Sequence, residues 1–309
     1  VDATFADRAF FCNSGAEANE AAFKLARRVA FDRFGSEKYE IIAALNSFHG
    51  RTLATLTATG QDHYHHGFGP LPAGFDYVPY GDLDALKAII SDKTCAVMLE
   101  AVQGEGGVHV PTAEYIQGVA ALCKEHDALL IFDEIQAGMG RTGKFGSYEN
   151  FGVKPDIITL AKGLAGGVPI GAFMATDKLA HTFAPGDHGS TFGGNPLACA
   201  GANVVLDTLL NGGLMENAAT VGAYLKAQLE ELQKQFPTLI KEVRGLGLIV
   251  GAELTKPGRE IVNACLGEGL IINCTAGNVL RFVPPLNITK AHVDILINGL
   301  KKVLPKYAD

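Results

Sequence analysis

Short apolar runs alternate with segments of helical periodicity over most of this 309-residue chain. The runs AFFCN, YEIIAALN, CAVMLE, ALLIFDE and DIITLAK are almost continuously hydrophobic, which is typical of strands that are buried on both faces. The segments between them have the 3.6-residue periodicity of amphipathic helices. The alternation therefore predicts an α/β fold whose mostly parallel sheet is covered by helices on both faces.

The pattern changes after the helical stretch from Pro196 to Leu210. A charged amphipathic helix (VGAYLKAQLEELQKQF) precedes a glycine-interrupted strand pair (IKEVRGLGLIVGAEL), a strand (NVLRFVPP) and a closing helix from Thr289. We therefore predict a large domain over residues 1–205 and a smaller α+β domain over residues 206–309.

Composition narrows the class of protein. A net charge of −7 argues against a nucleic-acid partner, because such proteins usually present a basic patch. No apolar run approaches the roughly 20 residues that a membrane span requires.

Single cysteines in apolar segments are typical of reduced thiols and favour the cytoplasm. The chain starts at Val1 without the features of a natural N-terminus or a signal peptide, so we expect an N-terminal segment to be missing.

The segment from Asn13 to Ala16 follows an apolar strand and precedes a long helix. Ser14 and Glu17 have the spacing of a capping box, and a well-capped helix is enough to explain the motif on its own. However, Gly15 and Ala16 leave the first-turn amides uncovered, and such amides bind phosphate groups. The motif thus predicts a phosphate site if other parts of a cofactor site follow.

Asp133 ends the apolar run LLIFD, at the sheet edge where α/β folds bind their ligands. A carboxylate there can pair with a pyridinium nitrogen and keep it protonated. Three residues later, Gln136 could hydrogen-bond a ring hydroxyl. A strand-end aspartate that caps the next turn is the common alternative.

Lys162 ends the apolar run DIITLAK and is followed by Gly163, Gly166 and Gly167. Lysine is almost never fully buried without a partner, so a lysine at the end of a buried strand suggests chemistry. Its amine can form a Schiff base with an aldehyde and transfer a proton, and the glycines allow the backbone to approach a flat ring. A hinge loop whose lysine reaches solvent is the alternative, and Asp133 makes it less favoured.

Two later segments carry further candidates. Ser190 and Thr191 stand beside paired glycines and suit contacts with a phosphate, although a generic turn has the same pattern. Arg281 is flanked by apolar residues, where an unpaired guanidinium is costly. We expect its partner to be either a substrate carboxylate or Glu105. The His-rich tract DHYHHGFGP is expected to be a surface loop rather than a metal site, and we expect no metal.

Six motifs occur in the order NSGAEANE, FHGRT, QGEGG, DEIQ-G-GRTG, AKGL-GG-PIGA and HGSTFGGNP. With them the chain resembles the class III (ω-) aminotransferases of fold type I, from about Phe10 to the C-terminus. The resemblance implies pyridoxal 5′-phosphate as cofactor, ping-pong transfer of a terminal amine to 2-oxoglutarate, and a homodimer with shared active sites. Two segments, SFHGRTLATLTATG and LIINCTAGNVLRFVPPLNIT, are most similar to the branch that acts on N2-acetylornithine.

The resemblance also implies a role for each matching residue. For the cofactor, it implies contacts from Ser14, phosphate binding by the amides of Gly15 and Ala16, ring stacking by Phe48, ring-nitrogen pairing by Asp133, a ring-oxygen contact from Gln136, covalent attachment at Lys162 and a phosphate contact in the neighbouring subunit from Thr191. For the substrates, it implies contacts from Arg51 and Ser190, and a Glu105–Arg281 pair that opens so that Arg281 binds an α-carboxylate.

Three alternatives remain open. Related enzymes act on ornithine, succinylornithine, succinyl-diaminopimelate or 4-aminobutyrate, and the pocket near Arg51 should decide among them. The chain could also be a truncated, non-catalytic dimerising fragment. A nicotinamide-binding enzyme is disfavoured, since no G-x-G-x-x-G follows the first strand.

Overall fold

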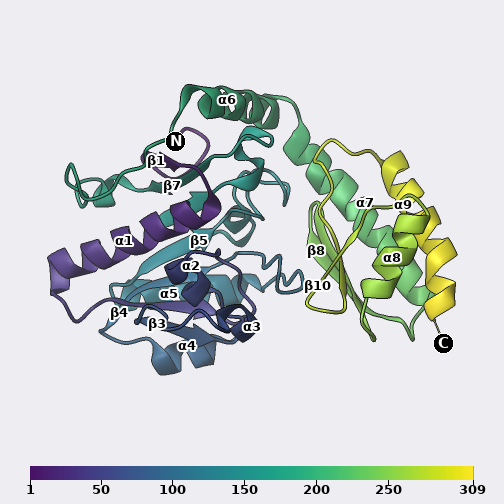
Figure 1. Ribbon diagram of the computed structural model, residues 1–309, viewed down its shortest axis with the longest axis horizontal. Helices are drawn as coiled ribbons and strands as arrows, with labels where there is room; N and C mark the ends of the chain where they lie inside the picture. The colour runs from purple at the N-terminus through teal and green to yellow at the C-terminus, as the bar shows by residue number, and fades with distance from the viewer. Residues whose placement is uncertain (309) are drawn as a thin grey trace.

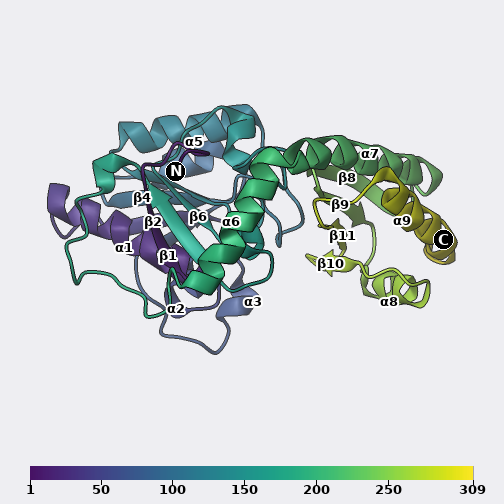
Figure 2. The same ribbon diagram turned by 90° about the horizontal axis from the view of Figure 1, so that it is seen from above.

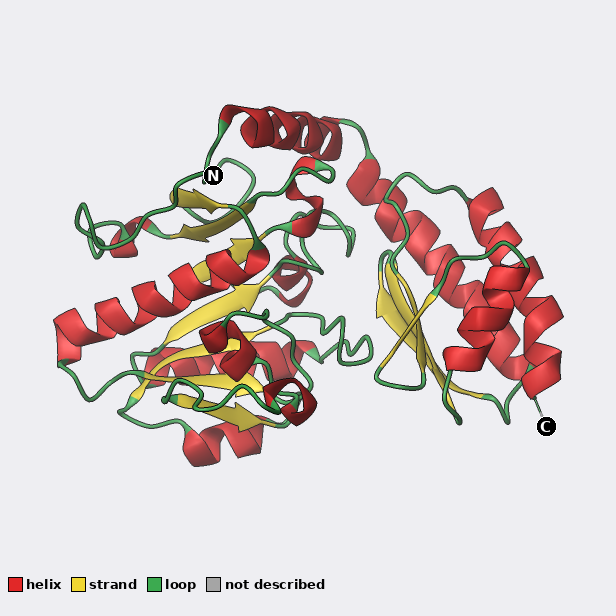
Figure 3. Ribbon diagram, in the orientation of Figure 1, coloured by secondary structure: helices red, strands yellow, loops and turns green. Residues whose placement is uncertain are grey.

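The computed structural model describes residues 1–308 and contains two β-sheets, each with its own helices (Figures 1 and 3). The larger sheet has seven strands in the order β1-β7-β6-β5-β4-β2-β3. Strands β2 to β6 run parallel to one another, whereas β7 is antiparallel to both β6 and β1. The prediction of an α/β fold with a mostly parallel sheet is therefore confirmed. Its strands are β1 (Arg8–Cys12), β2 (Glu40–Ala44), β3 (Phe75–Val78), β4 (Thr94–Leu99), β5 (Leu129–Asp133), β6 (Ile157–Leu160) and β7 (Gly171–Ala175).

Both faces of this sheet are buried. On one face Ile42, Val97 and Phe132 pack with residues of α4 and α5, and on the other Ile41 and Ile131 pack with α1. Successive strand residues point to opposite faces, so burial on both sides explains why these strands are apolar throughout. The helices of this part are α1 (Gly15–Phe34), α2 (Leu53–Ala58), α3 (Asp62–His65), α4 (Leu83–Ile89) and α5 (Ala113–Glu125), with 3₁₀ turns η1 (Ser147–Phe151), η2 (Lys162–Ala165) and η3 (Asp177–Leu179).

Helices α6 (Pro196–Asn211) and α7 (Leu214–Gln235) lead from the large sheet to the small one (Figure 2). Their axes differ by 66°, and among residues 1–308 no single helix is long and apolar enough to cross a membrane, although this bent pair meets the length and composition criteria when taken together. The predicted boundary between residues 205 and 206 falls within α6 and stays a prediction.

The small sheet is antiparallel, in the order β10-β11-β9-β8. It shares a separate apolar core with α7, α8 and α9, so the C-terminal part has α+β character. Its further elements are β8 (Ile240–Leu246), β9 (Ile249–Leu254), α8 (Arg259–Gly267), β10 (Asn273–Thr275), β11 (Val279–Phe282), α9 (Lys290–Val303) and η4 (Leu304–Tyr307).

Candidate active site

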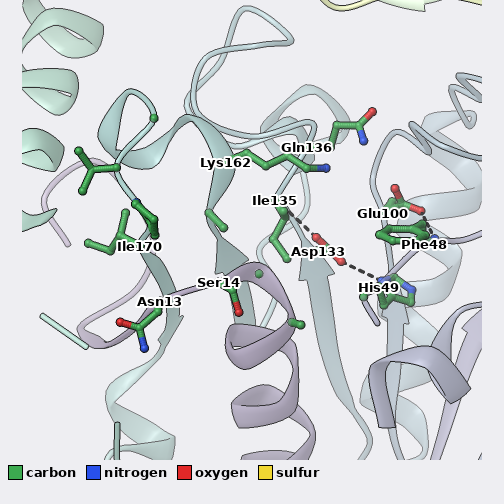
Figure 4. A pocket seen from close by; sticks show the side chains of 17 residues that line it. Asn13, Ser14, Phe48, His49, Glu100, Asp133, Ile135, Gln136, Lys162 and Ile170 are labelled. Carbon is green, nitrogen blue, oxygen red and sulfur yellow. Dashed lines mark hydrogen bonds and ion pairs between the residues drawn. The ribbon is translucent and has the colours of Figure 1, made fainter. Parts of the chain in front are cut away.

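A cavity of about 330 Å³ opens at the carboxyl edge of the large sheet (Figure 4). Parallel strands end at the same edge, so the segments after β2, β4, β5 and β6 meet there, and α1 begins beside them. Of the residues predicted from sequence, this cavity is lined by Ser14, Gly15, Ala16, Phe48, Asp133, Gln136 and Lys162.

The N-terminus of α1 points at this cavity. Ser14 is the N-cap, and its Oγ accepts a hydrogen bond from the Glu17 amide at 3.2 Å. The predicted cap is thus confirmed, and Glu17 also accepts a hydrogen bond from the amide of Asn13, at 2.8 Å. The amides of Gly15 and Ala16 precede the first intrahelical bonds of α1, so they are free to bind an anion.

Asp133 is buried at the end of β5 and is surrounded by donors. Its Oδ2 lies 2.8 Å from His49 Nδ1 and accepts a hydrogen bond from Asn19 Nδ2 at 2.9 Å, and its Oδ1 accepts from the Ile135 amide at 3.0 Å. A carboxylate accepts only, so His49 carries a proton on Nδ1. These bonds fix the orientation of the carboxylate at the cavity wall.

Sequence reasoning missed His49 and Asn19. Both side chains are fully buried. A buried polar group must find a partner, so Asn19 within the alanine-rich face of α1 was a usable signal. Within residues 1–308, His49 Nε2 and Asn19 Oδ1 have no hydrogen-bond partner.

Lys162 follows β6, and its side chain extends into the cavity toward Gln136, above Asp133 (Figure 4). The lysine is exposed, and the prediction that it ends the strand was wrong. The strand ends at Leu160, two residues earlier, and Lys162 has a φ of 41°. This left-handed conformation is rare for a residue with a side chain and occurs often at functional sites.

Glu100 is a second buried carboxyl group in the cavity wall that sequence reasoning missed. Its Oε2 accepts from the Phe48 amide at 3.1 Å and its Oε1 from the Gly104 amide at 3.3 Å. Burial raises its pKa to about 7. Glu100 thereby connects the loop of Phe48 with the loop of Glu105.

Gln136 and Lys162 also border a second cavity, which extends to the small sheet and contains Arg281 and Glu105. Arg281 Nη1 lies 2.8 Å from Glu105 Oε1 and donates to Gln136 Oε1 at 3.0 Å. Gln136 Nε2 donates to Glu105 Oε1 at 3.3 Å. The buried arginine is therefore paired with Glu105, one of the two partners expected from the sequence.

Three predicted residues line neither cavity within the part of the chain that the structure describes. The guanidinium of Arg51 is exposed and lies 4.5 Å from the ring centroid of Tyr64 and 5.5 Å from that of Phe48. Ser190 Oγ accepts from Asn13 Nδ2, in the first cavity's wall, at 3.2 Å. Thr191 is exposed. Their roles stay predictions.

The fold and the site together define an aminotransferase, with a lysine, a buried carboxylate and a helix N-terminus at one edge of a mostly parallel sheet. The chain belongs to the class III aminotransferase family, whose sequence model matches residues 1–304. The family predicted from the motifs is thus confirmed.

Relatives and solved structures agree with this placement. The chain is 53% identical over 302 residues to the acetylornithine aminotransferase of Caldanaerobacter subterraneus subsp. tengcongensis, covering 97% of this chain and 76% of that protein. It is 48% identical over 310 residues to a Pseudomonas aeruginosa succinylornithine transaminase/acetylornithine aminotransferase, covering 99% and 76%. The ornithine aminotransferase structure from Toxoplasma gondii matches with a TM-score of 0.92 and 36% identity, covering 97% and 73%.

Proposed function

We propose that this chain transfers the terminal amine of N2-acetylornithine to 2-oxoglutarate, with pyridoxal 5′-phosphate as cofactor. The products are N-acetylglutamate semialdehyde and glutamate, which places the enzyme in arginine biosynthesis. The observation that carries the proposal is the joining of two cavities at Lys162 and Gln136. One cavity has groups for the cofactor, and the other holds an arginine for a substrate carboxylate. Relatives about 50% identical over nearly the whole chain are named for this activity.

The first cavity fits the cofactor at each of its polar ends. The amides of Gly15 and Ala16, beside Ser14, suit the phosphate, and Asp133 suits the ring nitrogen. Phe48 is placed to cover a ring face, Gln136 to contact the ring oxygen and Lys162 to bind the aldehyde carbon. When bound, pyridoxal phosphate supplies an electron sink that stabilises negative charge on the carbon next to the substrate nitrogen.

The chain's own side chains then orient the reactants and move the proton. The exposed amine of Lys162 can take a proton from the substrate carbon and return it elsewhere, as a positioned general base and acid. His49 and Asn19 hold Asp133 so that its negative charge faces the cavity. No large rearrangement of this wall is then required during the reaction, which is the condition for electrostatic stabilisation by prearranged groups.

Arg281 and Glu105 let one pocket take two different substrates. While paired with Glu105, Arg281 is neutralised and leaves room for acetylornithine, which Arg51 and Ser190 would contact. When glutamate or 2-oxoglutarate binds, its α-carboxylate replaces Glu105 as the partner of Arg281. Arg281 contacts Glu105 through Nη1 alone, and its Nε has no hydrogen-bond partner within residues 1–308. A substrate carboxylate that formed two parallel hydrogen bonds with the guanidinium would therefore add a bond while keeping the charge balance.

We further propose that two copies associate through the face formed by α6 and the loop before it. Phe192, Leu197 and Val204 are 70%, 72% and 68% exposed there, and a cluster of exposed apolar side chains indicates a contact surface. Thr191 lies next to this face and would reach the cofactor phosphate of the partner.

The large domain would end near residue 205, where α6 leaves the large sheet. The free cysteines support a cytoplasmic location.

The absorption spectrum of the purified protein with added pyridoxal phosphate tests this function. We expect a visible band of the lysine-bound cofactor that collapses on adding N2-acetylornithine. The band should be lost in Lys162→Ala and kept in Lys154→Ala, which changes an exposed lysine away from the cavities. Ornithine, succinylornithine, succinyl-diaminopimelate and 4-aminobutyrate serve as competing donors. If folded protein forms no band, the non-catalytic alternative takes over.

A further inference from the structure

The loop that carries Glu105 belongs to the large α/β part but is fastened to the small sheet. Arg244, in β8, donates from Nε to the carbonyls of Gly107 and Val108 at 3.0 and 3.1 Å, and from Nη2 to Gly107 at 2.7 Å. Thr275 Oγ1, in β10, donates to the carbonyl of Glu105 itself. The small sheet thus holds the backbone at Glu105 and the two carbonyl groups that follow on its C-terminal side.

The conformation of this loop is strained, so it needs these contacts. Val108 is fully buried with a φ of 56°, which is unusual for a β-branched residue and persists only where the surroundings impose it. Its side chain rests on Gly251 of β9, where an added Cβ would lie 3.0 Å from Val108 Cβ. The missing side chain at Gly251 therefore makes the close approach possible.

Arg244 and Arg281 lie in one row across the small sheet, on either side of Gly251. Gly251 is the register partner of Arg244 in β8 and of Arg281 in β11, and directly paired residues share a face of the sheet. One arginine of this row binds the loop backbone, and the other binds the Glu105 side chain. The remaining nitrogen of Arg244, Nη1, is fixed by Glu253 at 2.5 Å and Glu242 at 2.8 Å.

We infer that Arg244 is a positioning residue that holds Glu105 against Arg281 and so sets how easily a dicarboxylate displaces Glu105. This inference rests on the proposed function, because it concerns the α-carboxylate that Arg281 would bind. Arg244 touches no residue of the cofactor cavity in the hydrogen bonds and ion pairs of the described chain. Its effect should therefore fall on dicarboxylate binding rather than on the cofactor.

The test is the dissociation constant of glutarate, an unreactive dicarboxylate, measured by calorimetry on the cofactor-loaded enzyme. In Arg244→Ala the loop loosens and Glu105 competes less well, so glutarate should bind about fivefold more tightly, the scale of a partly exposed ion pair. The KM for 2-oxoglutarate should fall in parallel, while kcat/KM for the amino donor changes little. Arg244→Lys keeps the charge but loses the paired donors, so it should give a smaller shift and serves if the alanine variant does not fold.

Two controls separate this role from a general structural one. Lys241→Ala removes a residue that pairs with the same Glu253 but makes no hydrogen bond to the loop, and it should leave the glutarate constant unchanged. In a Glu105→Gln background, Arg244→Ala should have no further effect, because the two changes act through one interaction. An unchanged glutarate constant, or an equal shift in both backgrounds, overturns the inference. If acetylornithine does not react with the wild type, the proposed function fails, yet the glutarate measurements still decide this inference.

Discussion

His49 Nδ1 lies 2.8 Å from Asp133 Oδ2, and both side chains are buried. The two residues are 84 positions apart in the sequence and come from the loop after β2 and the end of β5. A buried carboxylate is stable only when its lone pairs find donors. The His49 imidazole is therefore part of the candidate site, because it holds the Asp133 carboxylate in place.

Replacing His49 should weaken the fold before any cofactor is bound. His49→Ala removes a donor from buried Asp133, so we expect the free energy of unfolding of the cofactor-free protein to fall by about 1–3 kcal/mol. Denaturant unfolding measures this change. His181→Ala alters an exposed histidine and should stay within about 0.5 kcal/mol of the wild type. Equal effects in the two variants would contradict the role of His49.

A methyl group at Gly15 should impair cofactor binding. The Cβ in Gly15→Ala would lie 2.7 Å from Ile135 Cδ1, and Ile135 must move within the wall of the cavity. Because that atom is the end of a flexible side chain, the fold should tolerate the change, while the affinity for pyridoxal phosphate drops by about tenfold, or 1.4 kcal/mol. An absorbance titration gives the affinity. In Gly267→Ala, away from both cavities, the new methyl group meets no atom within 4 Å, so a similar loss there would argue against the steric explanation.

Glu100 should make stability depend on pH in a particular direction. Burial raises its pKa from 4.5 to about 7, so between these values the folded protein holds more protons at this group than the unfolded chain does. The free energy of unfolding must then fall as the pH rises through this window.

Comparing wild type and Glu100→Gln by denaturant unfolding at about pH 5 and about pH 7.5 isolates this contribution. The variant should lose less stability over the interval. Glu134, whose pKa is also raised to about 7 by burial, contributes in the same direction and remains in both proteins. Glu125→Gln, at an exposed position, should keep the wild-type dependence of unfolding free energy on pH. If Glu100→Gln also keeps it, the Glu100 carboxyl group is already charged across this pH range.

Gly222 of α7 should tolerate no side chain. A Cβ there would lie 2.1 Å from the carbonyl oxygen of Gly247, in the turn between β8 and β9, and backbone cannot move aside cheaply. Gly222→Ala should therefore cost about 2 kcal/mol or more in unfolding free energy. Gly267→Ala, also in a helix but with no atom within 4 Å, should be neutral or stabilising by up to about 1 kcal/mol. Thermal unfolding of the two variants, compared with the wild type, measures both changes.

The sequence predicted the strands that carry the site, because burial on both faces leaves a continuous apolar run. Strands β3 and β7 were not anticipated. Phe75–Val78 has only four residues, and Gly171–Ala175 follows a glycine-rich segment, so neither has a run long enough to stand out. The antiparallel β7 follows from pairing between β1 and β6, which no local pattern encodes.

The candidate site was predictable as far as it rests on strand ends and one helix start. Ser14, Asp133 and Lys162 follow apolar runs, and parallel topology brings such positions to one edge. The contacts of Asn19 and His49 with Asp133 join residues 114 and 84 positions apart, so spacing could not indicate them. The positive φ of Lys162 could not be predicted either, because residues with a side chain rarely adopt it.

Gln136 is hydrogen-bonded to both members of the Arg281–Glu105 pair and also lines the first cavity. In the proposed exchange, a dicarboxylate takes the place of Glu105, and both ends of this amide would then lose or change their partners. The hydrogen bonding that Gln136 can offer to a ring in the first cavity must change with them. We therefore expect a dicarboxylate bound at Arg281 to shift the absorption maximum of the bound cofactor, even when that dicarboxylate cannot react.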